Sequence, residues 1–312
     1  MPNQTAPAVA PVPLQPSLIE TMKKTVVFIQ AVCIEKDAKG APIQQGYSAT
    51  AFLLSFPDPR LAPNTSFTYL VTNKHLTQPG IEKGSPCSPI AYYLRLDLKA
   101  PDASGSYTTV GRIPPTAFNW TYSDDPSVDL AITPIGLDTS KLDIIFLPST
   151  LLLSDSDIKQ NRVEEGDSTL FTGLFIQLVG QSHSEPIIRE GKIAMMPREK
   201  VPTTLRSLGD IYLVDCHVFG GNSGSPIFVN LAGQRENGLI AGLNYKLLGV
   251  VSGYVKEEAS FALQTVAAYA GTLDSNSGVA VVVPAQQLLN LLDAPTLKAQ
   301  REQTIKNLPI AK

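Results

Sequence analysis

A glycine-rich segment, Gly220 to Pro226, has the composition of a loop that presents a serine nucleophile. It reads G-G-N-S-G-S-P, with Ser223 at its centre. Glycines allow positive φ angles and let backbone N–H groups converge beside a serine hydroxyl, as the stabilisation of an oxyanion requires. The alternative is a tight polar turn between two strands. A serine hydroxyl is a poor nucleophile without a base, so the catalytic interpretation requires a histidine and a group that orients it.

The chain has only three histidines, and they differ in their surroundings. His75 lies in V-T-N-K-H-L, directly after an apolar strand, where a side chain can face a cleft. His183 lies in a polar loop and is interpreted as a solvated surface residue. His217 precedes Ser223 so closely that the chain would have to reverse at the two intervening glycines before the side chains could meet. His75 is therefore the best candidate base, although a histidine at a strand end is ordinarily a surface residue.

The orienting acid is best supplied by S-V-D-L-A-I, in which Asp129 begins an apolar strand that would bury its carboxylate. A buried carboxylate suits the task of holding an imidazole in one tautomer. The neighbouring Asp124 and Asp125 are interpreted as turn residues. Along the chain the order is His, Asp, Ser. An α/β-hydrolase would place its histidine after the serine, and no histidine follows Ser223.

Overall composition excludes several classes of protein. The 312 residues carry 25 Lys plus Arg and 28 Asp plus Glu, a net charge of −3, which disfavours nucleic acid as a partner. The longest apolar run, residues 279–283, is far shorter than a membrane-spanning helix. No signal peptide is visible at the start, so the compartment stays open between the cytoplasm and export with a signal removed.

The three cysteines, Cys33, Cys87 and Cys216, lie far apart without the spacing of a metal ribbon or a disulfide framework, and we expect them to be unpaired. Asp215, Cys216 and His217 could suggest a metal site, but strand alternation would place Cys216 on the opposite face. We therefore expect no metal and no cofactor. A cysteine hydrolase using Cys216 or Cys87 is a weak alternative, because neither lies in a glycine-framed loop.

Short strands must position these groups. A capping-box spacing, Ser17 with Glu20, predicts a helix over Ser17 to Lys24. Segments rich in β-branched and aromatic residues then alternate with Gly, Pro, Asn and Asp clusters. They cover residues 25–34, 47–54, 67–71, 90–98 and 128–132, and then 168–174, 187–195, 211–216, 226–229, 247–254 and 279–283. Two sets of about six short strands predict an all-β protein with two antiparallel barrels or sandwiches.

With these residues and their order, the chain resembles the trypsin-like serine proteases. V-T-N-K-H-L around His75, V-D-L-A-I around Asp129 and G-N-S-G-S-P around Ser223 match the three motifs of that family in order. The gaps of 54 and 94 residues between the three positions match as well. Asn222 precedes the serine where animal trypsins carry Asp, so the chain looks closest to the prokaryotic trypsin-like peptidases related to the Deg/HtrA family. The resemblance covers roughly residues 18–293, without a PDZ domain.

The resemblance implies a fold of two six-stranded antiparallel β-barrels with short terminal helices, and a triad in the cleft between the barrels. The expected organisation is a Pro-rich tail over 1–16, an N-terminal barrel over 17–140, a connector over 141–165, a C-terminal barrel over 166–283 and a helical segment over 284–312. His75 and Asp129 would belong to the first barrel and Ser223 to the second.

By the same resemblance, the chain would be a serine endopeptidase that acts on polypeptides through an acyl-enzyme. Ser223 would attack, His75 would move the proton, Asp129 would hold the histidine, and the N–H groups of Gly221 and Ser223 would form the oxyanion hole. The alternative is a binding or scaffold protein on the same fold whose activity is latent or lost. The oligomeric state is open.

Specificity would depend on His217 and on the strand segment Ser252, Gly253 and Tyr254, which the family pattern places around the primary pocket. Because His217 stands where an Asp would receive a basic side chain, we expect a pocket that does not favour Arg or Lys and accepts acidic or medium apolar residues. Alternatively, His217 turns away and hydrogen-bonds a backbone carbonyl. Two further departures are Leu76, in place of a disulfide cysteine, and Asn222, which cannot form the salt bridge that activates animal zymogens.

Overall fold

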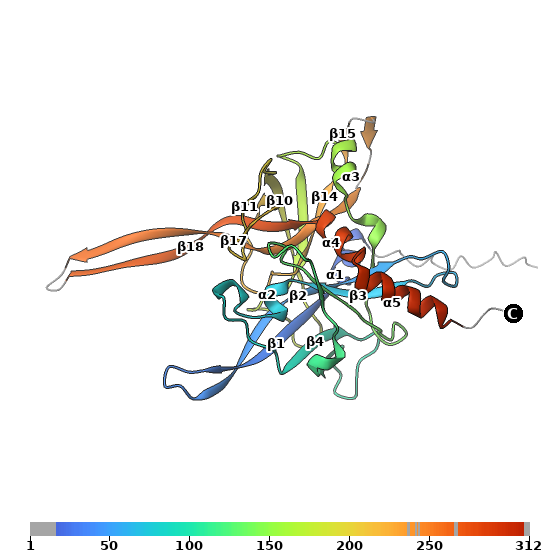
Figure 1. The fold of residues 1–312 in the computed structure, drawn as a ribbon, viewed down its shortest axis with the longest axis horizontal. Helices are drawn as coiled ribbons and strands as arrows, with labels where there is room; N and C mark the ends of the chain where they lie inside the picture. Colours follow the sequence, from blue (N-terminus) through green and yellow to red (C-terminus); the bar gives the residue numbers. More distant parts are fainter. Residues whose placement is uncertain (1–16, 236–237, 241, 243, 265–267, 309–312) are drawn as a thin grey trace, which may run out of the picture.

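The computed structural model describes residues 17–235, 238–240, 242, 244–264 and 268–308, without the side chains of 258–274. They form two antiparallel β-structures with short helices around them (Figure 1). The strands of the first are β1 Val26–Lys36, β2 Pro42–Phe56, β3 Phe67–Thr72, β4 Ala91–Asp97, β5 Thr108–Ile113, β6 Thr121–Tyr122, β7 Ala131–Pro134 and β8 Leu147–Pro148. Those of the second are β9 Ser168–Gly173, β10 Ile187–Met195, β13 Tyr212–Asp215, β14 Pro226–Asn230, β17 Tyr245–Gln264 and β18 Ala268–Pro284.

The first structure is an eight-stranded sheet in the order β5-β4-β1-β2-β3-β7-β6, with β8 pairing β2 in parallel. Six of its strands have at least four residues, and the other two, β6 and β8, have two residues each. The second structure is a closed six-stranded barrel in the order β10-β13-β18-β17-β14-β9. The prediction of an all-β fold built from two antiparallel barrel-like units is confirmed, and the two short strands are additions to it.

Two small hairpins lie outside the barrel ladder, formed by β11 Val201–Pro202 with β12 Leu208–Gly209, and by β15 Gly233–Arg235 with β16 Gly238–Ile240. The longest hairpin is formed by β17 and β18, whose pairing continues to Gln264 and Ala268. In Figure 1 this hairpin projects well beyond the body of the molecule. The predicted strands 247–254 and 279–283 are therefore the inner parts of two much longer strands.

The hydrophobic cores explain why the two structures stay together. One cluster lies within the first sheet and one within the barrel. A third joins Phe52 and Leu130 of the first half with Phe228 and Val283 of the barrel and with Leu288 of the C-terminal helix. Because this third core is shared, separating the two sheets would expose apolar surface on both of them.

Short helices border the strands. They are α1 Leu18–Lys23, α2 Lys74–Thr77, η1 Ile81–Lys83, η2 Pro115–Ala117, η3 Ser149–Leu151, α3 Asp155–Gln160, α4 Ala285–Leu292 and α5 Pro295–Lys306. The predicted first helix is confirmed, with the Ser17 hydroxyl accepting a hydrogen bond from the Glu20 N–H at 3.1 Å. No helix among the described residues is long and apolar enough to cross a membrane. The predicted Pro-rich tail over 1–16 lies outside the described residues.

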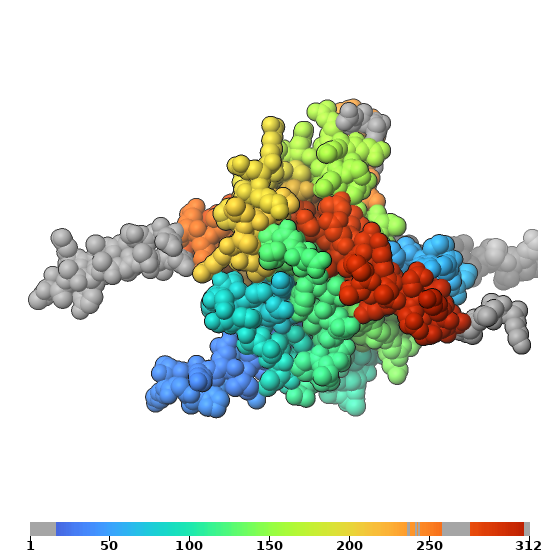
Figure 2. All heavy atoms as spheres, in the orientation of Figure 1, coloured from blue at the N-terminus to red at the C-terminus, as the bar shows by residue number. Residues whose placement is uncertain are grey.

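The C-terminal helices pack over the junction of the two sheets (Figure 2). Arg301 of α5 is buried and donates to the Tyr69 hydroxyl at 3.0 Å and to the Leu292 carbonyl at 2.8 Å. Its guanidinium also lies over the ring of Phe56, 4.4 Å from the centroid. A buried guanidinium needs such partners, so this residue joins the end of the chain to the first sheet.

The expectation that all three cysteines are unpaired was wrong. Cys33 of β1 and Cys87, in the loop after η1, form a disulfide with their Cα atoms 6.3 Å apart, and only Cys216 is free. The two positions are 54 residues apart in sequence. The sequence motifs could not predict this pairing, because β4 and the loop after η1 come to lie beside β1 only in the folded sheet. The disulfide ties the loop that follows His75 to the first sheet.

We expect the Cys33→Ser/Cys87→Ser variant to lose about 2–4 kcal/mol of unfolding free energy, since the bridge closes a long loop in the unfolded chain. Denaturant titrations of the variant and of the parent protein measure this loss. Cys216→Ala, which leaves the bridge intact, is the control for cysteine removal. In the unfolded but unreduced parent, a thiol titration should find one reactive thiol per chain; three would contradict the disulfide.

Candidate active site

His75 and Asp129 meet at the edge of the first sheet. His75 lies in α2, directly after β3, and Asp129 lies just before β7, which pairs with β3. The imidazole Nδ1 is 2.6 Å from Asp129 Oδ2, and the His75 backbone N–H donates to Asp129 Oδ1 at 2.9 Å. The Asn73 amide fixes the same corner by donating to the Asp129 carbonyl at 2.7 Å. The imidazole is therefore held by both oxygens of one carboxylate, directly and through its own backbone.

The second half of the molecule completes the surroundings of Asp129. The Ser252 hydroxyl of β17 donates to Asp129 Oδ2 at 2.5 Å, and the Thr204 hydroxyl lies 3.4 Å from the same oxygen. The carboxylate has no exposed surface, whereas the His75 side chain retains 26% of its exposure. A buried carboxylate with several donors stays ionised at low cost, and the partly open ring leaves one face of the base accessible.

The electrostatics follow from this burial. Burial acts to lower the pKa of His75, but the adjacent Asp129 carboxylate outweighs it, so the pKa of His75 lies above its usual value. Burial acts to raise the pKa of Asp129, but His75 and the hydrogen bonds from Ser252 and the His75 N–H hold that pKa below its usual range. Each charge of the pair thus stabilises the charged form of the other, relative to the same groups apart.

The Ser223 loop has a conformation that only glycine permits at two positions. Gly221 has φ +97° and Gly224 has φ +85°. A Cβ on Gly221 would come within 2.7 Å of the Ile176 side chain, and a Cβ on Gly224 would overlap the Thr50 carbonyl. The glycines that flank Ser223 in the sequence are thus required by both backbone angle and close packing.

Polar contacts from both halves hold this loop. The buried Asn222 amide donates to the Leu174 carbonyl at 2.5 Å and accepts from the Phe219 N–H at 2.7 Å. Thr50 of the first sheet donates its hydroxyl to the Gly221 carbonyl at 2.9 Å and its N–H to the Ser223 carbonyl at 2.9 Å. The loop is therefore fixed to the sheet that carries His75.

The N–H groups assigned to the oxyanion hole have no acceptor among the described residues. Within the described part of the chain, neither the Gly221 N–H nor the Ser223 N–H donates a hydrogen bond. Three other N–H groups of the loop are used, from Asn222 to the Phe219 carbonyl at 3.0 Å, from Gly224 to the Val251 carbonyl at 2.8 Å and from Ser225 to the Asn222 carbonyl at 3.0 Å. Unpaired N–H donors beside a serine hydroxyl can hydrogen-bond and stabilise an oxyanion.

The Ser223 hydroxyl is hydrogen-bonded to a group other than His75. It donates to the Ser252 carbonyl at 3.3 Å, and no hydrogen bond joins it to His75 among the described residues. Ser252 thus links the two groups, since its hydroxyl binds Asp129 and its carbonyl binds Ser223. Catalytic hydrogen bonds are often loose without substrate, so this geometry is compatible with transfer after rotation of the serine side chain.

A cavity of about 480 Å³ lies directly beside His75. Its walls include Ser252, Gly253 and Tyr254, three of the four residues that the sequence assigned to substrate binding. His217 is not among the lining residues. It is exposed, lies close to Gly278, where an added Cβ would be 3.1 Å from its ring, and makes no hydrogen bond to the described residues. The alternative in which His217 bonds a carbonyl is not seen.

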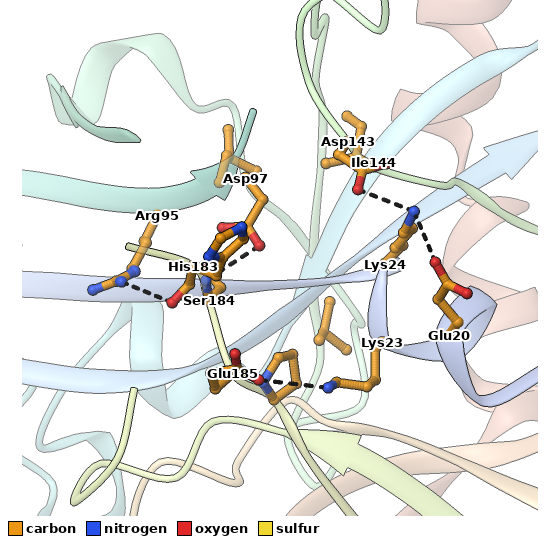
Figure 3. Close-up of a pocket in the computed structure, with 13 residues that line it drawn as sticks. Glu20, Lys23, Lys24, Arg95, Asp97, Asp143, Ile144, His183, Ser184 and Glu185 are labelled. Carbon is orange, nitrogen blue, oxygen red and sulfur yellow. Dashed lines mark hydrogen bonds and ion pairs between the residues drawn. The ribbon is translucent and has the colours of Figure 1, made fainter. Parts of the chain in front are cut away.

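A second cavity, of about 200 Å³, lies between α1, β4 and the loop before β10 (Figure 3). None of the predicted site residues lines it. His183 belongs to this region, where it is exposed and stacks on Tyr107 with ring centroids 4.5 Å apart. The interpretation of His183 as a surface residue agrees with this position.

No group of three or more metal-ligating side chains occurs among the described residues. Cys216 is buried, and burial raises its pKa to about 11. A thiol with that pKa is almost fully protonated near neutral pH, and Cys87 is in a disulfide, so neither cysteine is suited to act as a nucleophile.

Sequence reasoning missed two contributors to the site. Thr50 and Thr204 lie in segments without a local signal, and each acts through a contact across the molecule. Ser252 was identified as a substrate-binding residue, and it does line the cavity beside His75; the bond from its hydroxyl to Asp129 was not foreseen.

No family model matches the chain, and no curated protein matches it. Similar solved structures include the crystal structure of Deg5, with 16% identity and a TM-score of 0.42, covering 76% of this chain and 82% of that one. Another is an inactive mutant form of Rv3671c from M. tuberculosis H37Rv, with 16% identity and a TM-score of 0.43, covering 92% and 96%.

The Asp129→Asn variant should lower the pKa of His75. Loss of the carboxylate removes the charge that raises this pKa, while the burial that lowers it remains. An NMR titration of the ring proton, assigned with His75→Gln, measures the change. Asp125→Asn removes a nearby carboxylate that binds Ser127 rather than His75, and serves as the control. Equal His75 titrations in the parent and in Asp129→Asn would contradict the electrostatic account.

Proposed function

We propose that this chain is a serine endopeptidase with Ser223 as nucleophile, His75 as general base and Asp129 as the orienting acid. The observation that carries the proposal is the buried Asp129 carboxylate, which accepts both the ring and the backbone N–H of His75. A partly open imidazole held in this way has its Nε2 available for a proton. The glycine-framed Ser223 loop, anchored to the same sheet by Thr50, supports the assignment of the nucleophile.

In the proposed reaction, the Ser223 hydroxyl leaves the Ser252 carbonyl and turns toward His75. Its oxygen attacks the carbonyl carbon of the scissile bond while its proton passes to His75 Nε2. The N–H groups of Gly221 and Ser223 would stabilise the negative oxygen of the tetrahedral intermediate. His75 then gives the proton to the leaving amine, and an acyl-enzyme forms. A water molecule, deprotonated by His75, releases the acyl group and restores Ser223.

A second candidate is a binding or scaffold protein on the same fold with latent or lost activity. The bond from the Ser223 hydroxyl to the Ser252 carbonyl favours it, because a hydroxyl held there is not deprotonated by His75. The two candidates differ in one measurable property, the reactivity of Ser223.

A fluorophosphonate probe should label the parent protein, and Ser223→Ala should abolish labelling. The matched control is Ser225→Ala, in the same loop, whose buried hydroxyl has no hydrogen-bond partner in the described part of the chain. Cys216→Ala should label like the parent. If the folded parent fails to label, the protease proposal is wrong and the scaffold candidate remains.

With a cleavable peptide, Ser223→Ala should lower kcat by about 10⁶-fold and Asp129→Asn by about 10⁴-fold, as for other Ser-His-Asp enzymes. The acid limb of the parent's pH–rate profile should lie above about pH 6.5, because the raised pKa of His75 keeps the base protonated to a higher pH. Kinetics from about pH 5 to 9 measure this limb.

For the primary pocket we propose His217 as a neighbour of the substrate side chain at the scissile bond, with Ser252 to Tyr254 as the adjoining strand. Gly278 leaves the ring of His217 uncovered on one side. We expect acidic or medium apolar residues to be accepted there in preference to Arg and Lys. A peptide library varied at that position measures the order, and fastest cleavage after Arg would contradict it.

A further inference from the structure

The cavity beside His75 carries an excess of positive charge that the proposed reaction does not use. Its lining includes three cationic side chains, Lys83, Arg206 and Lys256, and one acidic side chain, Glu82. The chain as a whole has a net charge of −3. A local positive excess in a near-neutral protein points to a negatively charged occupant.

Two of these cations come from separate segments of the chain, η1 and the turn between β11 and β12. Lys83 ends η1, in the loop that the Cys33–Cys87 disulfide ties to β1. Arg206 lies in the turn between β11 and β12, where its backbone has φ +59° and its N–H donates to the Thr203 carbonyl at 3.0 Å. Both side chains are exposed. Within the described part of the chain, neither forms an ion pair.

The second cavity shows the contrasting arrangement (Figure 3). There Lys24 lies 3.0 Å from Asp143 and 3.2 Å from Glu20, and Lys23 lies 3.7 Å from Glu185. Its two lysines are thus paired with neighbouring carboxylates, and its third cation, Arg95, donates to the Gly180, Gln181 and His183 carbonyls. At the cavity beside His75, Lys83 and Arg206 are left for a partner from outside.

The wall formed by Ser252, Gly253 and Tyr254 indicates what that partner is. These residues belong to β17, whose pairing with β14 ends at Val250. Beyond Val250, β14 no longer covers this edge of β17. A polypeptide added antiparallel to it, as every strand of this barrel pairs, would run toward Ser252 and Ser223. Residues N-terminal to the scissile bond would then lie over the cavity.

We propose that this cavity selects polypeptides with an acidic side chain, Asp or Glu, within the second to fourth residues before the scissile bond, held between Lys83 and Arg206. The proposal rests on the proposed protease function and names the substrate class of that site. Glu82 would repel the acidic side chain, but it is the single carboxylate in a lining that carries Lys83 and Arg206.

The test uses peptides that differ only in Glu, Gln or Lys at each of these three positions. Each is measured for kcat/KM with the full chain and for Kd with Ser223→Ala. At low salt, Glu at one position should be preferred over Gln by roughly fivefold, the range of exposed ion pairs, and over Lys by more. The preference should decrease as salt is added.

The Lys83→Glu/Arg206→Glu variant should reverse the order and prefer Lys. Lys159→Glu/Arg198→Glu makes the same change in net charge at exposed residues outside the cavity and should keep the parent's preference. Equal affinity for Glu and Gln peptides at all three positions would overturn the proposal. It would also be overturned if Lys83→Glu/Arg206→Glu kept the same preference as the control variant. The Kd measurements need no catalysis, and labelling of Ser223 is a separate readout. Failure of the protease proposal can therefore be distinguished from failure of the proposal on acidic substrates.

Discussion

The fully buried carboxylate of Asp129 is the constraint on which the rest of the site depends. An ionised carboxylate without exposure is costly unless donors surround it, and here the donors come from both halves of the molecule. His75 supplies two from the first sheet, and Ser252 supplies one from the barrel. The carboxylate therefore has all its hydrogen-bond donors only when the two sheets are docked correctly. Correct docking is thus coupled to the ionisation of Asp129 and His75.

The same requirement explains how the nucleophile loop is held. Ser223 belongs to the barrel, but the contacts of its loop with Thr50 reach the first sheet, and Asn222 fixes the loop to Leu174 within the barrel. The shared hydrophobic core and the helices α4 and α5 keep these surfaces together. The hydrogen bonds that position the Ser223 loop are thus supported by the shared apolar core, where small displacements are costly.

Charge is arranged differently in the two cavities. At the cavity of Figure 3 both lysines are paired with carboxylates and Arg95 donates to backbone carbonyls, so these cations are used within the junction of α1, the first sheet and the barrel. At the cavity beside His75 the disulfide-anchored loop and the β11–β12 turn present cations outward. Both cavities are lined by charged side chains, and the pairing of those charges separates a structural junction from a surface suited to recognition.

The sequence by itself determined the all-β class, most strand positions and the candidate residues His75, Asp129 and Ser223, because each is encoded locally. Alternating apolar residues define a strand, and a glycine-framed serine defines its loop. Tertiary structure alone decided that Ser252 binds Asp129, that Thr50 holds Gly221 and that Cys33 pairs with Cys87. These contacts join residues 123, 171 and 54 positions apart. No local pattern contains them, since they depend on the relative position of the two sheets. That position also brought Lys83 and Arg206 to one cavity, and it left the Ser223 hydroxyl on the Ser252 carbonyl rather than on His75.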